Sequence, residues 1–242
     1  MTKRPIKTIN NYSPNFTTYK RTKKNIKYLI FHYTGMRSES EAIKRLTDGK
    51  SKVSCHYFIK KDGSLILMVP EIYEAWHAGI SSWKKDKLLN KKSIGIEISN
   101  KGHQFGYHSY SKQQIKSLIK ISKYLIKKYK IKKSHILGHS DIAVFRKIDP
   151  GEKFPWEYLA KNQIGHWHGI NKKILKKNRN KKISKFEKIK FYEYLLKIGY
   201  FFKSNKKMLV KNFQRHFRQN LINGKIDQEC LLIAEKMSKF KS

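Results

Sequence analysis

Ile26-Lys-Tyr-Leu-Ile-Phe-His-Tyr33 is the stretch that decides the fold, because it is short, apolar and rich in β-branched and aromatic residues. Such a run predicts a buried β-strand. Ser93-Ile-Gly-Ile-Glu-Ile-Ser99 and His135-Ile-Leu-Gly138 are further runs of this kind. The chain is therefore expected to build a sheet from strands that lie far apart in the sequence.

Helices are predicted between these strands, beginning near Ser38, Ser111 and Pro155. Each of the two serines is followed three residues later by Glu or Gln, the pattern of a capping box. The segments 54–60 and 64–69 read as two more strands, and an Asp-Gly pair between them predicts a hairpin. Strands that alternate with helices, together with one hairpin, predict an α/β domain with a mixed central sheet flanked by helices.

The composition divides the chain into four segments. Residues 1–25 are basic and look irregular, and the α/β domain spans residues 26–170. Residues 171–183 are dense in Lys and Arg and lack acidic residues, which predicts a basic linker. Residues 184–242 contain three amphipathic helical patterns, which predict a small all-α three-helix domain. A domain of that size can fold alone only marginally.

The net charge is compatible with nucleic-acid binding, because the chain has 55 Lys and Arg and only 17 Asp and Glu. Only eight of the 55 basic residues are Arg, the side chain that base recognition favours. A solvated surface with a compositional bias is the favoured explanation for the excess of Lys, and attraction toward a polyanion is the alternative. No apolar run reaches the roughly 18 residues that span a bilayer, so no transmembrane segment is expected.

Four side chains are candidates for catalysis or metal binding. Glu97 lies within an otherwise apolar strand, where it either points to a wet face or acts as a buried general base with a raised pKa. His32 and His139 lie at strand ends, and Asp149 is held rigid by the proline that follows it. Two His and one Asp suit Zn²⁺ with an open fourth position, although the wide spacing gives this set no local motif.

Several motifs occur together in one order, and together they resemble the zinc N-acetylmuramoyl-L-alanine amidases of the AmpD/AmiD type, which share a fold with peptidoglycan recognition proteins. The motifs are His32-Tyr-Thr34, Val53-Ser-Cys-His-Tyr57, Asp62-Gly63, Ala75-Trp-His-Ala-Gly79, Ser93-Ile-Gly-Ile-Glu97, Gly138-His-Ser-Asp-Ile-Ala143, Arg146-Lys-Ile-Asp-Pro-Gly151 and Phe154-Pro-Trp156. The resemblance covers about residues 26–168. The tail resembles a three-helix peptidoglycan-binding domain, chiefly through Asn212-Phe-Gln-Arg-His-Phe-Arg218.

This resemblance implies a role for each matching residue. One Zn²⁺ per chain would be held by His32, His139 and Asp149. Glu97 would be the catalytic carboxylate, and Lys147 would help to stabilise the oxyanion. Trp76 and His77 fall in the segment that lines the substrate groove and are candidates for substrate binding.

The resemblance also implies the reaction and the partner. The expected activity is zinc-dependent hydrolysis of the amide between the lactyl group of N-acetylmuramic acid and L-alanine, in peptidoglycan or muropeptides. The helical tail would hold the enzyme on polymeric wall, and its deletion would spare small soluble substrates. A non-catalytic peptidoglycan sensor and a basic nucleic-acid-binding protein are the alternatives, and cleavage of another amide of the peptide stays open.

The chain is expected to be a monomer that binds no nucleic acid. It shows no apolar leader near its beginning, so the cytoplasm is the default location, and the wall-binding tail makes the periplasm or cell envelope the alternative.

Overall fold

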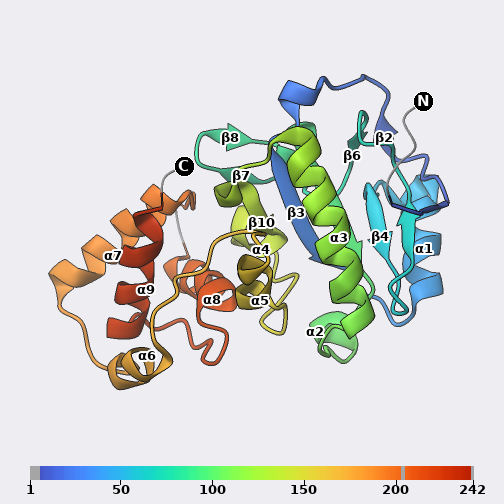
Figure 1. Cartoon of the computed structure of the whole chain (residues 1–242). Coiled ribbons are helices and arrows are strands. Elements are labelled where there is room, and N and C mark those ends of the chain that lie inside the picture. Colours follow the sequence, from blue (N-terminus) through green and yellow to red (C-terminus); the bar gives the residue numbers. More distant parts are fainter. Residues whose placement is uncertain (1–5, 203–204, 241–242) are drawn as a thin grey trace.

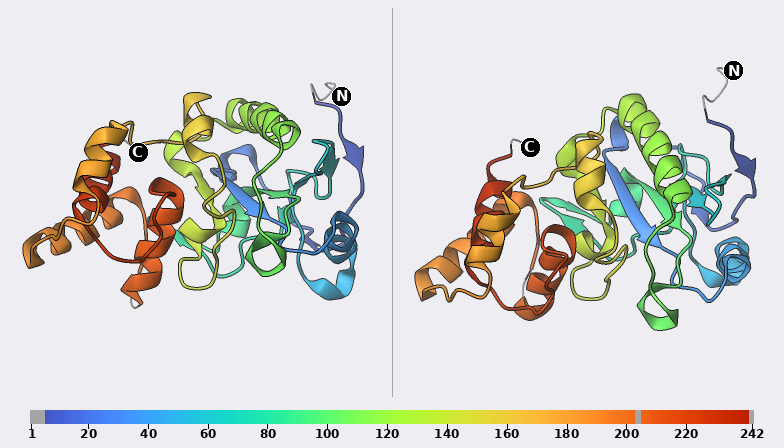
Figure 2. Two further views of the ribbon diagram at one scale, coloured as in Figure 1. Left: turned by 90° about the horizontal axis from the view of Figure 1, so that it is seen from below. Right: turned by 60° about the horizontal axis from the view of Figure 1, so that its bottom comes forward.

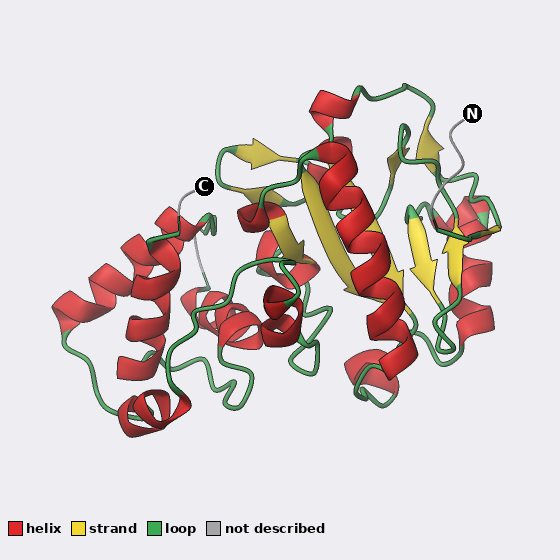
Figure 3. Ribbon diagram, viewed as in Figure 1, coloured by secondary structure: helices red, strands yellow, loops and turns green. Residues whose placement is uncertain are grey.

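The computed structural model describes residues 6–202 and 205–240. A six-stranded sheet organises the fold, and Figures 1 and 3 show how its strands and the helices are arranged. The strands follow the order β1-β5-β4-β9-β3-β10 across the sheet. Their bounds are Ile9–Asn10 (β1), Leu65–Leu67 (β5), Tyr57–Ile59 (β4), Ser93–Ile98 (β9), Tyr28–Tyr33 (β3) and Ile136–Gly138 (β10). Only the β4–β5 hairpin is antiparallel within this sheet. The predicted mixed sheet is confirmed.

Helix α3 (Lys112–Tyr129) covers one face of the sheet (Figure 1). Successive strand residues point to opposite faces, so Leu29 and Phe31 of β3 share a core with Leu118 and Leu125 of α3. Ser111 caps this helix and exchanges hydrogen bonds with Gln114 as predicted.

The C-terminal helices cover part of the other face, at the β10 edge (Figure 2). These helices are α6 (Lys172–Asn178), α7 (Lys185–Ile198), α8 (Lys206–Phe217) and α9 (Gln228–Ser238). Tyr28 and Ile30 of β3 belong to the same apolar core as Phe191 of α7 and Phe213 of α8. The helical region and the α/β region therefore share a hydrophobic core.

The remaining elements are short and surround the sheet. They are α1 (Glu39–Thr47), α2 (Gly102–Phe105), α4 (His139–Ile142), α5 (Trp156–Lys161), the paired strands β2 (Phe16–Thr17) and β6 (Glu74–Ala75), and the paired strands β7 (Ser82–Trp83) and β8 (Asp86–Lys87). Single 3-10 turns lie at residues 23–25, 49–51, 89–92 and 133–135. Within the described ranges, no helix has the length and apolar character that crossing a membrane requires.

Two segments differ from their predictions. Residues 1–25 were expected to be irregular, but β1 extends the central sheet, β2 pairs with β6, and buried Arg21 donates to the carbonyls of Asn90, Ser93 and Glu71. Within residues 171–183, expected to be a linker, α6 forms and buries Leu175 in the shared core. The predictions for residues 1–5, 203–204 and 241–242 lie outside the described residues.

Candidate metal centre and catalytic cleft

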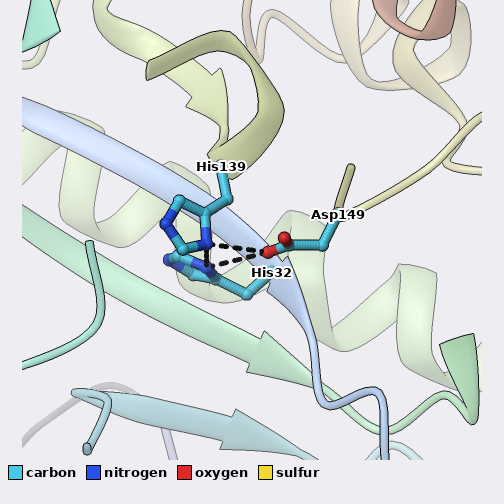
Figure 4. A group of neighbouring side chains, drawn as sticks. All are labelled: His32, His139 and Asp149. Carbon is cyan, nitrogen blue, oxygen red and sulfur yellow. Dashed lines mark hydrogen bonds and ion pairs between the residues drawn. The ribbon is translucent and has the colours of Figure 1, made fainter. Parts of the chain in front are cut away.

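Three side chains that are distant in the sequence meet at one end of the sheet (Figure 4). His32 lies near the end of β3, and His139 is the first residue after β10. Because these parallel strands are neighbours, their carboxyl ends deliver both imidazoles to the same edge. The two Nδ1 atoms are 3.0 Å apart, and each lies 3.1 Å from Oδ2 of buried Asp149.

The hydrogen bonds of the opposite ring nitrogens determine where the imidazole protons lie. Nε2 of His139 lies 3.2 Å from the carbonyl oxygen of Ala78, which can only accept, so Nε2 carries the proton. In the neutral form of this ring, Nδ1 of His139 therefore presents a lone pair to the cluster.

His77 determines which ring nitrogen of His32 carries the proton, through a chain of hydrogen bonds. The hydroxyl of Ser93 donates to the carbonyl of Leu89 at 2.6 Å and is left to accept from Nε2 of His77 at 3.0 Å. Nδ1 of His77 then accepts from Nε2 of His32, also at 3.0 Å. Nδ1 of neutral His32 is consequently unprotonated and faces Asp149.

The protonation states favour a divalent cation. Burial and the neighbouring His139 lower the pKa of His32 to about 4. Neutral imidazoles and an ionised carboxylate are the forms that bind Zn²⁺, and three lone-pair atoms this close together need a cation between them. The donor set therefore fits the predicted zinc.

Glu97 lies directly beside His32, because the two residues are register partners on β9 and β3. Its Oε2 is closed to solvent and has no hydrogen-bond partner in the described parts of the chain. Burial raises the pKa of Glu97 well above its usual value, and the charge of Asp149 adds to this while Lys147 opposes it. Glu97 as a whole is half-buried, with Oε2 enclosed and the side chain at the edge of a cavity.

A cavity of about 370 Å³ opens over this cluster. Glu97, His139, Lys147 and Asp149 all line it. Trp76 also lines it, with its indole N–H donated to Thr17. The arrangement can hold a carbonyl compound against a metal, with a carboxyl group and an ammonium group nearby.

The role of His77 is the feature that sequence reasoning missed. It was expected to touch substrate, and it does border the cavity, but it is buried and both ring nitrogens are used in orienting His32. Its ring lies against Gly95, where an added Cβ would sit 2.4 Å from the imidazole. The glycine in Ser93-Ile-Gly-Ile-Glu97 was the available signal for this close approach.

Other histidines have structural contacts. His56 accepts the backbone N–H of Gly95 in the core, which is a structural role. Nδ1 of His168 accepts the N–H of Ile170, and His166 stacks on Phe240. No metal-ligand group containing His166 or His168 exists among residues 6–202 and 205–240.

The comparisons with known proteins agree with this geometry. A sequence profile described as N-acetylmuramoyl-L-alanine amidase matches residues 22–152, which is more than half of the chain. The chain belongs to the N-acetylmuramoyl-L-alanine amidase family. This amidase is 35% identical over 229 residues to the N-acetylmuramoyl-L-alanine amidase AmiD of Escherichia coli K12, covering 88% of this chain and 82% of that protein.

Two solved structures align with almost the whole of this amidase. E. coli AmiD in complex with anhydro-N-acetylmuramic acid-L-Ala-D-γ-Glu-L-Lys has a TM-score of 0.78 at 32% identity and covers 91% of both chains. AmpDh3 from Pseudomonas aeruginosa has a TM-score of 0.77 at 29% identity, covering 96% of this chain and 98% of its own. The fold predicted from the sequence, including the helical region, is thus the fold of AmiD.

Proposed function

We propose that this amidase hydrolyses the amide between the lactyl group of N-acetylmuramic acid and L-alanine, using one zinc ion held by His32, His139 and Asp149. The observation that carries the proposal is the meeting of these three side chains beside a cavity that His139, Asp149 and Glu97 line. The likeness to AmiD, whose structure contains a muropeptide, supports the choice of substrate.

The chemistry divides between the metal and the residues of this chain. A bound zinc ion would supply Lewis acidity, which lowers the pKa of water and polarises the scissile carbonyl. Glu97 accepts the proton of the attacking water and later donates it to the departing amine of L-alanine. The ammonium of Lys147 stabilises the negative charge that develops on the carbonyl oxygen, and losing one such donor costs about 3 kcal/mol.

Mass spectrometry of muropeptides incubated with zinc-loaded or chelator-treated enzyme tests the proposal. The expected products are a free peptide with an N-terminal alanine and the corresponding sugar, formed only by the zinc-loaded enzyme. Release of shorter peptides would indicate another amide of the stem. No release at all would favour the non-catalytic sensor.

We propose that the enzyme binds muropeptides as a monomer. We do not expect it to bind nucleic acid. Stem peptides carry carboxylates, which the surface Lys residues attract in a salt-dependent manner. Muropeptide binding that exceeds the affinity for duplex DNA at physiological salt is the expected result. Tight binding to any DNA would instead support the nucleic-acid alternative.

We further propose that the helical region binds polymeric wall. A cavity of about 670 Å³ lies between the two regions, lined by residues of both, including Trp167, Arg179 and Asn220. Full-length enzyme with Glu97→Gln should co-sediment with insoluble sacculi, and failure to co-sediment contradicts wall binding. We propose the cytoplasm as the location of the enzyme, with the cell envelope as the alternative. Cell fractionation decides between the two.

A further inference from the structure

We propose that helix α8 is part of the catalytic apparatus, in which Asn212 is a positioning residue for the loop that carries Lys147 and Asp149. The inference rests on the proposed function, because Lys147 takes its importance from that chemistry. It gives a purpose to the Asn212-Phe-Gln-Arg-His-Phe-Arg218 motif that differs from wall binding.

The first link is a pair of hydrogen bonds from one side-chain amide. Nδ2 of Asn212 donates to the carbonyl of Val144 at 2.7 Å and to the carbonyl of Lys147 at 3.0 Å. The same loop is closed by the N–H of Lys147, which donates to the carbonyl of Ala143. Asn212 is fully buried, and its Oδ1 accepts from Arg215 at 2.7 Å, which fixes the orientation of the amide. One side chain of α8 therefore holds both ends of the turn that presents Lys147.

The second link runs to the segment that carries His139. Asp141, two residues further on, is fully buried and accepts from the hydroxyl of Tyr200 at 2.6 Å. His216 of α8 lies 2.8 Å from the other oxygen of Asp141. His216 follows Asn212 by four residues, so both project from the same face of α8. This face contacts two of the segments that bear functional side chains.

The third link is apolar. Ile142 and Val144 of the catalytic segment are buried in the same core as Leu209 and Phe213 of α8. Deleting residues 171–242 would expose this surface, so we expect the deletion to abolish hydrolysis of small soluble substrates as well. This expected result is the opposite of the one for a tail that only tethers the enzyme.

One solved amidase structure corresponds to only part of this chain. The solved AmpD structure aligns over 93% of its own length but only 64% of this chain, with a TM-score of 0.56. An amidase fold can thus form without a counterpart to about a third of this chain, whereas here α8 supplies donors to the catalytic loop.

The test compares two isosteric changes on one helix. Asn212→Asp keeps the acceptor for Arg215 and removes the donor to the two loop carbonyls. Gln214→Glu is the matched control, because the amide of Gln214 is equally buried and its donor contacts in the described residues stay within the helical region, to Asn223, Lys225 and Cys230. Both changes place a carboxylate in the interior of that region, so general destabilisation affects both variants.

The expected result is a fall in kcat of about 10- to 100-fold for Asn212→Asp on a soluble muropeptide, with KM and zinc content within about twofold of wild type, since small displacements of catalytic groups have effects of this size. Hydrogen–deuterium exchange of residues 143–149 in the full chain should rise in Asn212→Asp and not in Gln214→Glu. A kcat within twofold of wild type together with unchanged exchange, or an equal loss in Gln214→Glu, overturns the inference.

Failure of the proposed function gives a different pattern from failure of this inference. If wild-type enzyme releases no peptide, the amidase proposal fails, while the exchange comparison still reports whether Asn212 orders the loop. If wild-type enzyme is active and Asn212→Asp matches it in both readouts, only the positioning role fails.

Discussion

Replacing Glu97 with Gln removes the group that moves protons and changes little else. Oε2 of Glu97 has no hydrogen-bond partner among residues that the structure describes, and the amide has nearly the same shape as the carboxyl group. The three proposed metal ligands are untouched. We therefore expect zinc content and folding to be retained, and kcat to fall 10²- to 10⁴-fold, which corresponds to about 2.7 to 5.5 kcal/mol in the activation free energy.

The assay is release of alanine-terminated peptide from a purified muropeptide, measured alongside zinc content by atomic absorption. Asp86→Asn is a suitable control, because Asp86 bonds Tyr28 and Lys92 and does not line the cavity. A Glu97→Gln enzyme with more than a tenth of wild-type turnover would refute the assignment of Glu97 as the proton carrier. Loss of zinc together with activity would show instead that Glu97 supports the metal.

Three further predictions concern the metal, the core and the pH. His77→Ala should weaken zinc binding 10- to 100-fold, measured in competition with a chromogenic chelator, because it removes the hydrogen-bond partner that orients His32. His135→Ala, at the other end of β10, should leave the zinc affinity unchanged. Equal affinities of the two variants would exclude the orienting role of His77. Phe213→Ala should lower the free energy of unfolding by about 3–5 kcal/mol, because the ring is fully buried in the shared core, and an unchanged urea midpoint would show that the two regions are not coupled there. Folding raises the pKa of Glu97 in the chelated enzyme. The free energy of unfolding of the wild type should therefore fall relative to that of Glu97→Gln as the pH rises from about 4 through the folded-state pKa. A difference in unfolding free energy that stays constant between pH 4 and 8 would contradict this.

The strands and the capped helices could be predicted because local patterns specify them. The β-branched run of β3 and the capping box at Ser111 depend only on near neighbours. The pairing of His32 with Glu97 needs the register of two strands some 60 residues apart, which no local pattern contains. The metal set was reached through resemblance to a family, since 107 residues separate His32 from His139.

The misinterpreted segments share a physical cause, which is that long-range burial overrides composition. The sequence of helix α6 is rich in Lys. Even so, Leu175 is buried in the shared core and Arg179 forms an ion pair with buried Glu229. Arg21 reads as one more surface charge, although it ties the N-terminal segment to carbonyls near β9. In both cases the partner that stabilises the residue lies 50 to 72 residues away.

The shared core also bears on how the newly made chain matures. Ile233 and Met237 of α9 belong to the same apolar core as Tyr28 and Ile30, so residues about 200 positions apart in the sequence must come together before that interior closes. Contacts of such large sequence separation form late. We expect a nascent chain to lack amidase activity until α9 has left the ribosome, because the core that supports the catalytic segment is incomplete before then.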